Sequence, residues 1–371
     1  MKLKKIIIPL LAALSALGVG FSTLMPQSAS QTSTNTGSAP LEIHFIDVGQ
    51  GDSTLIRCGD STMLIDAGEN DQGTNVQSYL TAQGVDHLDY MIGTHPDSDH
   101  IGGMDVILYK FDCDTVIMPD ESKDTSTYRD VIDTMKSKRY VNTLPVVGDT
   151  YSLGEASFTI LAPSRSHENS NDNSVAILLT YGENRFLFTG DAQEAAEEDI
   201  LDCGISIQAD VYKAGHHGSS TSSTEDFLKA VAPTYAVISC GEDNDYGHPH
   251  SEVLNSFRSM GVQVFRTDEQ GSIIAYSDGQ NITWNCSPSD SWLSGSGAHV
   301  GGTSSSSGDN GASNNSGNQK MVYVCNINTM KFHYPDCSSA TEMKKENRQE
   351  ITATRNELIK QGYEPCGGCK P

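Results

Sequence analysis

Basic residues are scarce in this sequence: 24 lysines and arginines stand against 48 aspartates and glutamates, which gives the 371 residues a formal net charge of -24. Such a surplus of acid disfavours broad electrostatic attraction to nucleic acid or anionic lipid, although it is compatible with a local basic patch. The surplus favours solubility and the binding of cations.

Long apolar runs are missing after the N-terminus, and a helix that spans a bilayer needs about 20 apolar residues. The early run at 6–21 contains one proline and two glycines, and it follows three lysines among the first five residues. This order is typical of a secretory signal peptide, which we place at residues 1–30. We therefore expect a secreted, extracellular protein without stable membrane insertion after cleavage, and retention in the membrane if the signal stays uncleaved.

A framework in which every cysteine is paired is excluded, because the chain has nine cysteines. Four of them lie after residue 320. The other five are scattered mainly in apolar segments, which predicts buried thiols at Cys58, Cys113, Cys203, Cys240 and Cys286.

Composition divides the mature chain into four parts. Residues 31–40 are polar and read as a flexible tether, and residues 294–319 are almost all Ser, Gly and Asn, which predicts a linker. Between them, residues 41–293 alternate short apolar strands with polar helices, which indicates an α/β domain with a large core. Residues 320–371 form a small unit, below the size at which apolar burial alone usually suffices.

The pattern of the large domain predicts individual elements from the period of the apolar residues. The predicted strands are 41–48, 53–58, 62–65, 88–93, 115–118, 157–161, 174–181, 185–188, 211–214, 235–239 and 263–266. The predicted helices are 74–83, 126–139, 192–201, 223–230 and 251–260, the last with Ser251 as its N-cap.

Potential metal ligands are densest directly after the predicted strand 88–93. His95, Asp97, Asp99 and His100 occupy six positions there, in a loop at the edge of a sheet. The alternative is a polar loop in which Asp97 or Asp99 caps the next helix, but a cap needs one carboxylate and no histidine. The pattern therefore favours metal binding.

Further ligand-type residues follow later strands, namely Asp191, His216, His217, His248 and His250. Taken singly, each has an ordinary interpretation, because an Asp after Thr-Gly is often a turn residue and a lone His is often a structural hydrogen-bonding group. Their recurrence at the ends of several strands is how α/β folds assemble a site.

These motifs together resemble the metallo-β-lactamase superfamily, and more closely the extracytoplasmic domain of the competence protein ComEC and its soluble relatives. The resemblance runs from about residue 41 to residue 282. It is carried by His95-x-Asp97-x-Asp99-His100 with LIDAG at 64–68 and TGD at 189–191, and by HFIDVGQGDS at 44–53, NDNS at 171–174, KAGHHGS at 213–219 and YGHPH at 246–250.

The resemblance implies an αββα sandwich with two divalent ions, Zn²⁺ or Mn²⁺, in a dinuclear site. His95 and Asp97 would hold the first ion, Asp99, His100 and His217 the second, and Asp191 would bridge them. Asp66 would orient a ligand. His216 and His248 would face the substrate or complete the ligand set, and the choice between His216 and His217 as the ligand stays open.

Two positions depart from the superfamily pattern. The usual His-x-His opening is His95-x-Asp97 here, a substitution shared with the ComEC group, and a midway histidine is replaced by Asn173. The first ion is therefore expected to be weak, exchangeable or absent. Oxygen-rich ligation shifts the preference toward harder ions such as Mn²⁺ without excluding Zn²⁺.

Hydrolysis is the chemistry that such a site predicts, because two cations activate a water and stabilise charge on attacking and leaving oxygens. We expect a secreted, metal-dependent phosphodiesterase, in particular a nuclease for extracellular DNA, with Asp99, His216 and His248 as catalytic residues. One alternative is hydrolysis of another phosphodiester, such as a phosphocholine or cell-wall ester, which the acidic surface favours. Another is a catalytically impaired binding module. The sequence identifies no protein partner.

The small C-terminal unit carries a second set of ligand types. His333, Cys337, Cys366 and Cys369 would make a closed Cys3His zinc site that stabilises the unit, with Cys325 as a competing ligand. The alternative is a disulfide pair, which export permits. Residues 322–371 also resemble the metal-binding domain of the Ada DNA-repair protein, which implies contact with DNA, although the charge of residues 320–371 is only +2.

Overall fold

The structure is a computed structural model, and it describes residues 40–295, 321–333, 340, 343–353 and 355–366. The predicted signal peptide lies outside the described residues, as do nearly all of the tether and the linker. Within the described ranges, no helix combines the length and the apolar character that crossing a membrane requires. The chain divides into two compact units, residues 1–300 and 301–371.

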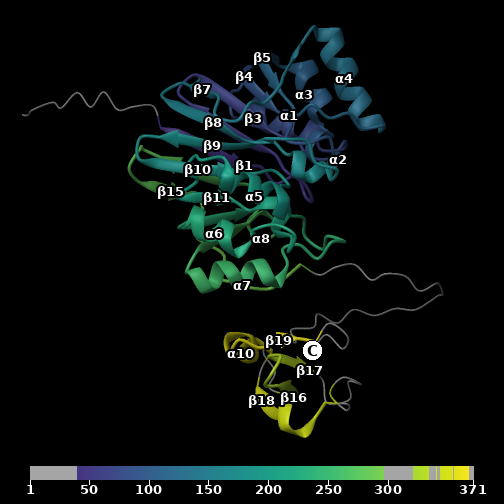
Figure 1. The fold of residues 1–371 in the computed structure, drawn as a ribbon, viewed down its shortest axis with the longest axis vertical. Coiled ribbons are helices and arrows are strands. Elements are labelled where there is room, and N and C mark those ends of the chain that lie inside the picture. Colours follow the sequence, from purple (N-terminus) through teal and green to yellow (C-terminus); the bar gives the residue numbers. More distant parts are fainter. Residues whose placement is uncertain (1–39, 296–320, 334–339, 341–342, 354, 367–371) are drawn as a thin grey trace, which may run out of the picture. The chain divides into compact units, whose positions relative to one another are not determined.

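The first sheet of the large unit has eight strands in the order β15-β14-β1-β2-β3-β4-β5-β6 (Figure 1). Strands β3 to β6 are parallel, and the pairings from β15 through to β3 are antiparallel. The strands are β1 Leu41–Phe45, β2 Thr54–Cys58, β3 Ser61–Ile65, β4 His87–Ile92, β5 Asp112–Ile117, β6 Asn142–Thr143, β14 Ile273–Ser277 and β15 Ile282–Trp284.

The second sheet has seven strands in the order β13-β12-β11-β10-β9-β8-β7. Strands β10 to β13 are parallel, so their carboxyl ends share one edge. The strands are β7 Thr150–Leu153, β8 Ala156–Ala162, β9 Ala176–Tyr181, β10 Asn184–Phe188, β11 Val211–Lys213, β12 Tyr235–Ile238 and β13 Gln263–Arg266.

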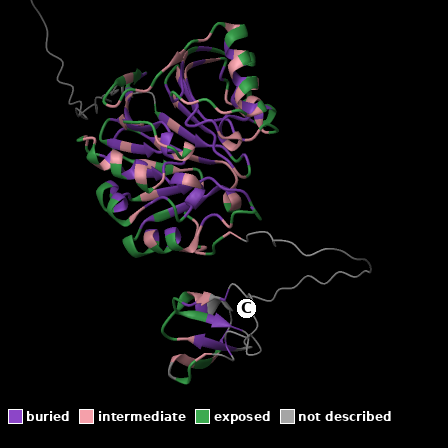
Figure 2. Cartoon of the chain, turned by 45° about the vertical axis from the view of Figure 1, so that its right-hand side comes forward, coloured by how far each residue is buried: buried purple, intermediate pink, exposed green. Residues whose placement is uncertain are grey.

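Helices cover the outer face of each sheet, and the two inner faces pack together (Figure 2). Side chains that alternate along both sheets fill the space between them, as Phe45 and Phe188 do with ring centroids 6.2 Å apart. The first sheet is covered by α1 Gly73–Ala82, α3 Met104–Lys110 and α4 Ser126–Lys138, and the second by α5 Glu194–Asp202, α6 Glu225–Val231 and α7 Ser251–Met260. The predicted αββα sandwich is confirmed.

Local predictions differ from the structure at a few places. Helix α7 has His250 at its N-cap, so the prediction of Ser251 as the cap is wrong by one residue. Helix α5 begins at Glu194, two residues later than expected, because the chain still turns after Asp191. Of the five predicted buried thiols, those of Cys203 and Cys286 are half-buried, and the other three are buried.

The small unit contains a four-stranded sheet in the order β18-β16-β17-β19. Its strands are β16 Met321–Asn326, β17 Lys331–His333, β18 Arg348–Ala353 and β19 Glu364–Pro365, and its helix is α10 Arg355–Lys360. One small core forms around Tyr323, Phe332 and Leu358, and a second cluster joins Val324, Ala340 and Cys366.

Candidate metal centre

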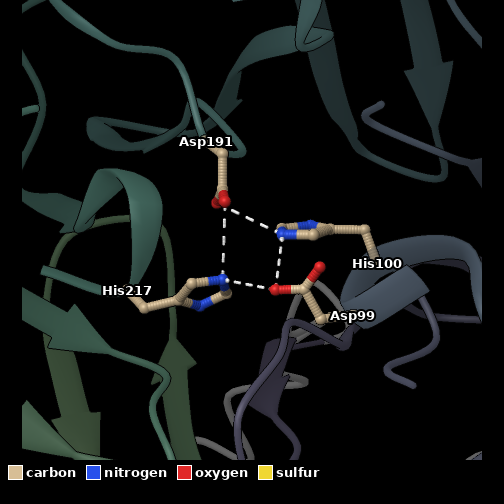
Figure 3. A group of neighbouring side chains, drawn as sticks. All are labelled: Asp99, His100, Asp191 and His217. Carbon is tan, nitrogen blue, oxygen red and sulfur yellow. Dashed lines mark hydrogen bonds and ion pairs between the residues drawn. The ribbon is translucent and has the colours of Figure 1, made fainter. Parts of the chain in front are cut away.

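A cluster of carboxylates and imidazoles lies at the ends of three strands of the large unit. The loop after β4 leads into α2, Ser98–Ile101, which carries Asp99 and His100. Asp191 follows β10, and His217 lies in a short turn after β11. One ligand atom from each of these four residues lies within 4.8 Å of the others, as Figure 3 shows. We call these four residues the central cluster.

The ligand atoms of the central cluster face one another at short range. His100 Nε2 lies 3.2 Å from Asp191 Oδ1 and 3.8 Å from Asp99 Oδ2. His217 Nε2 lies 3.2 Å from Asp99 Oδ2 and 3.5 Å from Asp191 Oδ2. Three of the side chains are buried, whereas Asp99 is 25% exposed, so the cluster is reached from solvent at Asp99.

The donor set fits a divalent cation. His95 Nε2, His100 Nε2 and Asp191 Oδ1 are all buried and make no hydrogen bond, although His100 Nε2 and Asp191 Oδ1 face each other at 3.2 Å as an ion pair. Leaving such atoms unsatisfied costs about 1–3 kcal/mol each, so their convergence needs a compensating charge. Imidazole nitrogens with carboxylate oxygens are ligands that Zn²⁺ and Mn²⁺ accept.

Asp66 orients His100 from behind. It lies fully buried, and it accepts hydrogen bonds from Thr94 N at 2.8 Å and Thr94 Oγ1 at 2.7 Å. His100 Nδ1 lies 2.8 Å from Asp66 Oδ2, so Nδ1 carries the proton and Nε2 faces the cluster.

A second supporting group, which the sequence analysis did not identify, lies behind His217. His217 Nδ1 lies 3.0 Å from the Ser239 carbonyl and 3.3 Å from Asp52 Oδ1, and the buried Lys213 Nζ lies 2.9 Å from both oxygens of Asp52. Burial alone would raise the pKa of Asp52, but Lys213 and His217 hold it below its usual value. Asp52 lies in the motif at 44–53 and Lys213 in the motif at 213–219. A lysine at the end of an apolar strand was the sequence feature that could have pointed to this pair.

The charges of the central cluster are mutually dependent. Burial opposes charge on every member, yet Asp191 raises the pKa values of His100 and His217 well above normal. Those two imidazoles in turn lower the pKa of Asp99 to about 2 against the effect of burial. Without a cation, protons on the imidazoles therefore neutralise the carboxylates, and a divalent ion would replace those protons.

Three other predicted histidines lie around the central cluster. His95 Nε2 is 4.0 Å and His216 Nε2 3.7 Å from Asp191 Oδ2, and His248 packs its ring 6.0 Å from that of His217. Burial and the neighbouring His100 lower the pKa of His95 to about 4, and burial with His217 lowers that of His248 to about 3. Of the two adjacent histidines, His217 belongs to the central cluster and His216 lies at its more exposed margin.

Asp97 and Asn173 lie outside the central cluster. Asp97 is at the N-cap position of α2, but its side chain makes no capping hydrogen bond and instead forms an ion pair with Lys123. Asn173 Nδ2 donates to Glu121 Oε2 at 3.0 Å and to the His167 carbonyl at 3.1 Å. The side chains predicted to hold the first ion therefore converge less closely than those predicted to hold the second.

The predicted ligands of the small unit are described only in part, because Cys337 and Cys369 lie outside the described residues. His333 is paired with Val324, which packs against Cys366. Cys325 packs in the other core, with Phe332. Since paired residues of neighbouring strands share a face, His333 lies on the Cys366 face and Cys325 on the opposite face. The zinc site itself stays a prediction.

An αββα sandwich with carboxylates and imidazoles gathered at its strand ends is an arrangement that can hold a metal ion. The chain belongs to the metallo-beta-lactamase superfamily, whose family model matches residues 46–242. The resemblance seen in the sequence is therefore confirmed for the large unit, and the centre is one that binds divalent metal.

Relatives link the large unit to competence proteins. The chain is 30% identical over 255 residues to ComE operon protein 3 of Bacillus subtilis, covering 62% of this chain and 32% of that protein. It is 31% identical over 230 residues to competence protein ComA of Neisseria gonorrhoeae, covering 61% and 31%. The chain thus spans about a third of the length of these relatives.

Among solved structures, the metallo-beta-lactamase fold protein YhfI of Bacillus subtilis is similar, with a TM-score of 0.45 and 14% identity. The match covers 64% of this chain and all of that one.

Proposed function

We propose that the large unit is a metal-dependent phosphodiesterase that cleaves DNA. One observation carries the proposal: ligand atoms of Asp99, His100, Asp191 and His217 converge within 4.8 Å, and three of these four side chains are buried. A divalent ion bound there would activate water and stabilise the charge that develops on phosphate oxygens. The name of one relative, competence protein ComA, supports nucleic acid as the substrate.

The histidines around the central cluster would take different roles. Because the pKa of His248 is lowered to about 3, its imidazole is neutral near pH 7 and suits hydrogen bonding to a phosphate oxygen. His216 is more exposed, and its Nδ1 lies 2.9 Å from Thr221 Oγ1, which fixes the ring with Nε2 toward Asp191. Burial also lowers the pKa of His216, but its side chain reaches solvent, so His216 is the better candidate to pass a proton between solvent and the leaving oxygen.

A smaller phosphodiester with a cationic group is the second candidate, and a specific feature favours it. Tyr246 is 65% exposed and stacks on His248 with ring centroids 5.6 Å apart. The exposed carboxylates of Glu242, Asp243 and Asp245 lie in the same loop. An aromatic face beside carboxylates suits a quaternary ammonium, as in a phosphocholine ester, better than a polyanion.

Two substrates separate these candidates. The full chain is incubated with linear DNA, and separately with a phosphocholine diester, in the presence of Mn²⁺ or Zn²⁺. Metal-dependent cleavage of DNA that is lost in Asp99→Ala but kept in the exposed-site control Asp60→Ala supports the nuclease. Turnover of the choline ester alone supports the second candidate, and metal binding without turnover of either contradicts both.

We also propose that the enzyme acts outside the cell. The basic residues and apolar run at the N-terminus support export, and an acidic surface is compatible with a secreted, soluble enzyme.

A further inference from the structure

Of the two residues expected to hold the first metal ion, His95 has an available ligand atom, whereas Asp97 is engaged by other side chains. His95 Nε2 is buried, has no hydrogen-bond partner, and lies 4.0 Å from Asp191 Oδ2. Its expected companion Asp97 is engaged elsewhere, by Lys123 and by Ser170 Oγ at 3.3 Å. Both contacts are made to Oδ1 of Asp97.

Asn173 does not complete this position. Its Oδ1 accepts from the His167 backbone N–H at 2.7 Å, and its Nδ2 donates to Glu121 Oε2 and to the His167 carbonyl. With the amide used in this way, Asp97 is the remaining anionic residue of the expected set besides the bridging Asp191. Binding of the first metal ion therefore depends on whether the Asp97 carboxylate is available.

Lys123 is placed to exert that control. It lies in the segment between β5 and α4, and its side chain is 35% exposed, close to the 31% of Asp97. An ammonium and a metal ion are both cations that seek the same carboxylate, and each weakens the binding of the other by repulsion. The central cluster has no lysine among its ion pairs within the described residues.

We propose that the centre binds two divalent ions with unequal affinity, and that Lys123 sets the difference by competing with the weaker ion for Asp97. The tighter ion lies in the central cluster, whose ligands are already gathered. The weaker ion takes His95, Asp97 and the shared Asp191, and it binds only when the Lys123 ammonium leaves Asp97. The inference rests on the proposed function to the extent that both require a metal-binding centre.

Isothermal titration calorimetry with Mn²⁺, starting from protein whose large unit holds no metal, tests this competition. The metal-free full chain is titrated with Mn²⁺, which prefers the oxygen and imidazole ligands of the large unit to the thiolates of the C-terminal unit. The wild-type protein should show a tight and a weak class of site. Lys123→Met should tighten the weak class about tenfold or more and leave the tight class unchanged.

Two further variants make the result specific. Lys136→Met removes a lysine of α4 that pairs with the exposed Asp133, and it should change neither class. Asp97→Asn should abolish the weak class and keep the tight one. Thermal melting of each metal-free variant checks that its fold is retained.

Several outcomes overturn the inference. Equal affinity at two wild-type sites contradicts it, as does a weak class that Lys123→Met leaves unchanged or that survives Asp97→Asn. Two unequal classes with the predicted response to Lys123→Met, in a protein that cleaves no phosphodiester, would support the competition and overturn the proposed function. Absence of all Mn²⁺ binding would overturn the inference, and absence of Zn²⁺ binding by the large unit as well would also overturn the proposed function.

Discussion

Each imidazole of the central cluster is backed by a buried carboxylate. Asp66 holds His100 through Nδ1, and Asp52, neutralised by Lys213, lies against Nδ1 of His217. Such contacts fix the ring and its tautomer, and so keep Nε2 directed at the ion. The residues that do not touch an ion therefore contribute to metal affinity at this site.

Replacement of Asp66 tests this contribution. Asp66→Asn should lower the affinity for the tighter ion about 10–100-fold, because an amide holds the His100 Nδ1–H more weakly than a carboxylate. Asn tolerates the left-handed backbone at this position, where φ is 58°, so the fold should survive. Asp60→Asn, in the exposed turn of the same hairpin, is the matched control in the titration. Unchanged affinity in Asp66→Asn contradicts the orienting role.

Metal affinity should also depend on pH. Because the pKa values of His100 and His217 are raised, both imidazoles are protonated near pH 7 in the metal-free protein. Binding should then release about two protons, so affinity rises as pH increases and falls as pH decreases. Calorimetry in buffers of different ionisation enthalpy measures this release. A binding enthalpy that is the same in all buffers would contradict it.

At the scale of elements, the metal-binding loop is fixed by close packing of backbone on backbone. Asp52 N donates to the Asp99 carbonyl at 3.0 Å, which ties the segment after β1 to α2. Gly51 makes this approach possible, since a Cβ there would come within 2.5 Å of the same carbonyl oxygen. A motif glycine thus positions the loop that carries two of the four ligands.

Substitutions at two glycines distinguish the cost of backbone strain from the cost of steric overlap with a neighbouring segment. Gly84→Ala, where φ is +75° and no heavy atom lies near a new Cβ, should cost about 1–2 kcal/mol of stability. Gly51→Ala should cost about 1–3 kcal/mol more and weaken metal binding, because the loop must move. Denaturant unfolding and Mn²⁺ titration of both variants measure the two effects. Equal stability and equal metal affinity in the two variants would contradict the packing argument.

The fold was largely predictable from the sequence because its strands are short apolar runs with clear turns between them. Strand β1 and helix α4 lie within one to three residues of their predicted limits. Helix α3 was missed because Met104–Lys110 is short and mostly apolar, which periodicity alone does not distinguish from a strand.

The candidate site was predictable only where its residues follow strands in recognisable motifs. The partner of Asp97 was not predictable, because Lys123 lies 26 residues away in an irregular segment and reaches Asp97 only through the tertiary fold. The pairing of Asp52 with Lys213, 161 residues away, could not be predicted either, although Lys213 itself is marked by its position at the end of the buried strand β11. Ion pairs between segments that are far apart in the chain leave no periodic signal in the sequence.

At the scale of the whole molecule, each of the two units has its own core, and we expect separate metal sites in them. His333→Ala should lower the zinc content by about one equivalent and leave Mn²⁺ binding by the large unit unchanged. Cys325→Ala is the control, because Cys325 packs on the face opposite His333 and should keep the zinc. Elemental analysis gives the count, and loss of zinc in Cys325→Ala alone would contradict the ligand set.

Anomalous X-ray diffraction from crystals of the full chain grown with Mn²⁺ would show whether the four residues of the central cluster bind a metal ion. A strong manganese peak is expected between the ligand atoms of Asp99, His100, Asp191 and His217. A weaker peak beside His95 and Asp97 should grow in Lys123→Met. A well-ordered map with no peak in the central cluster, or with manganese bound only elsewhere, would show that the central cluster is not the metal site.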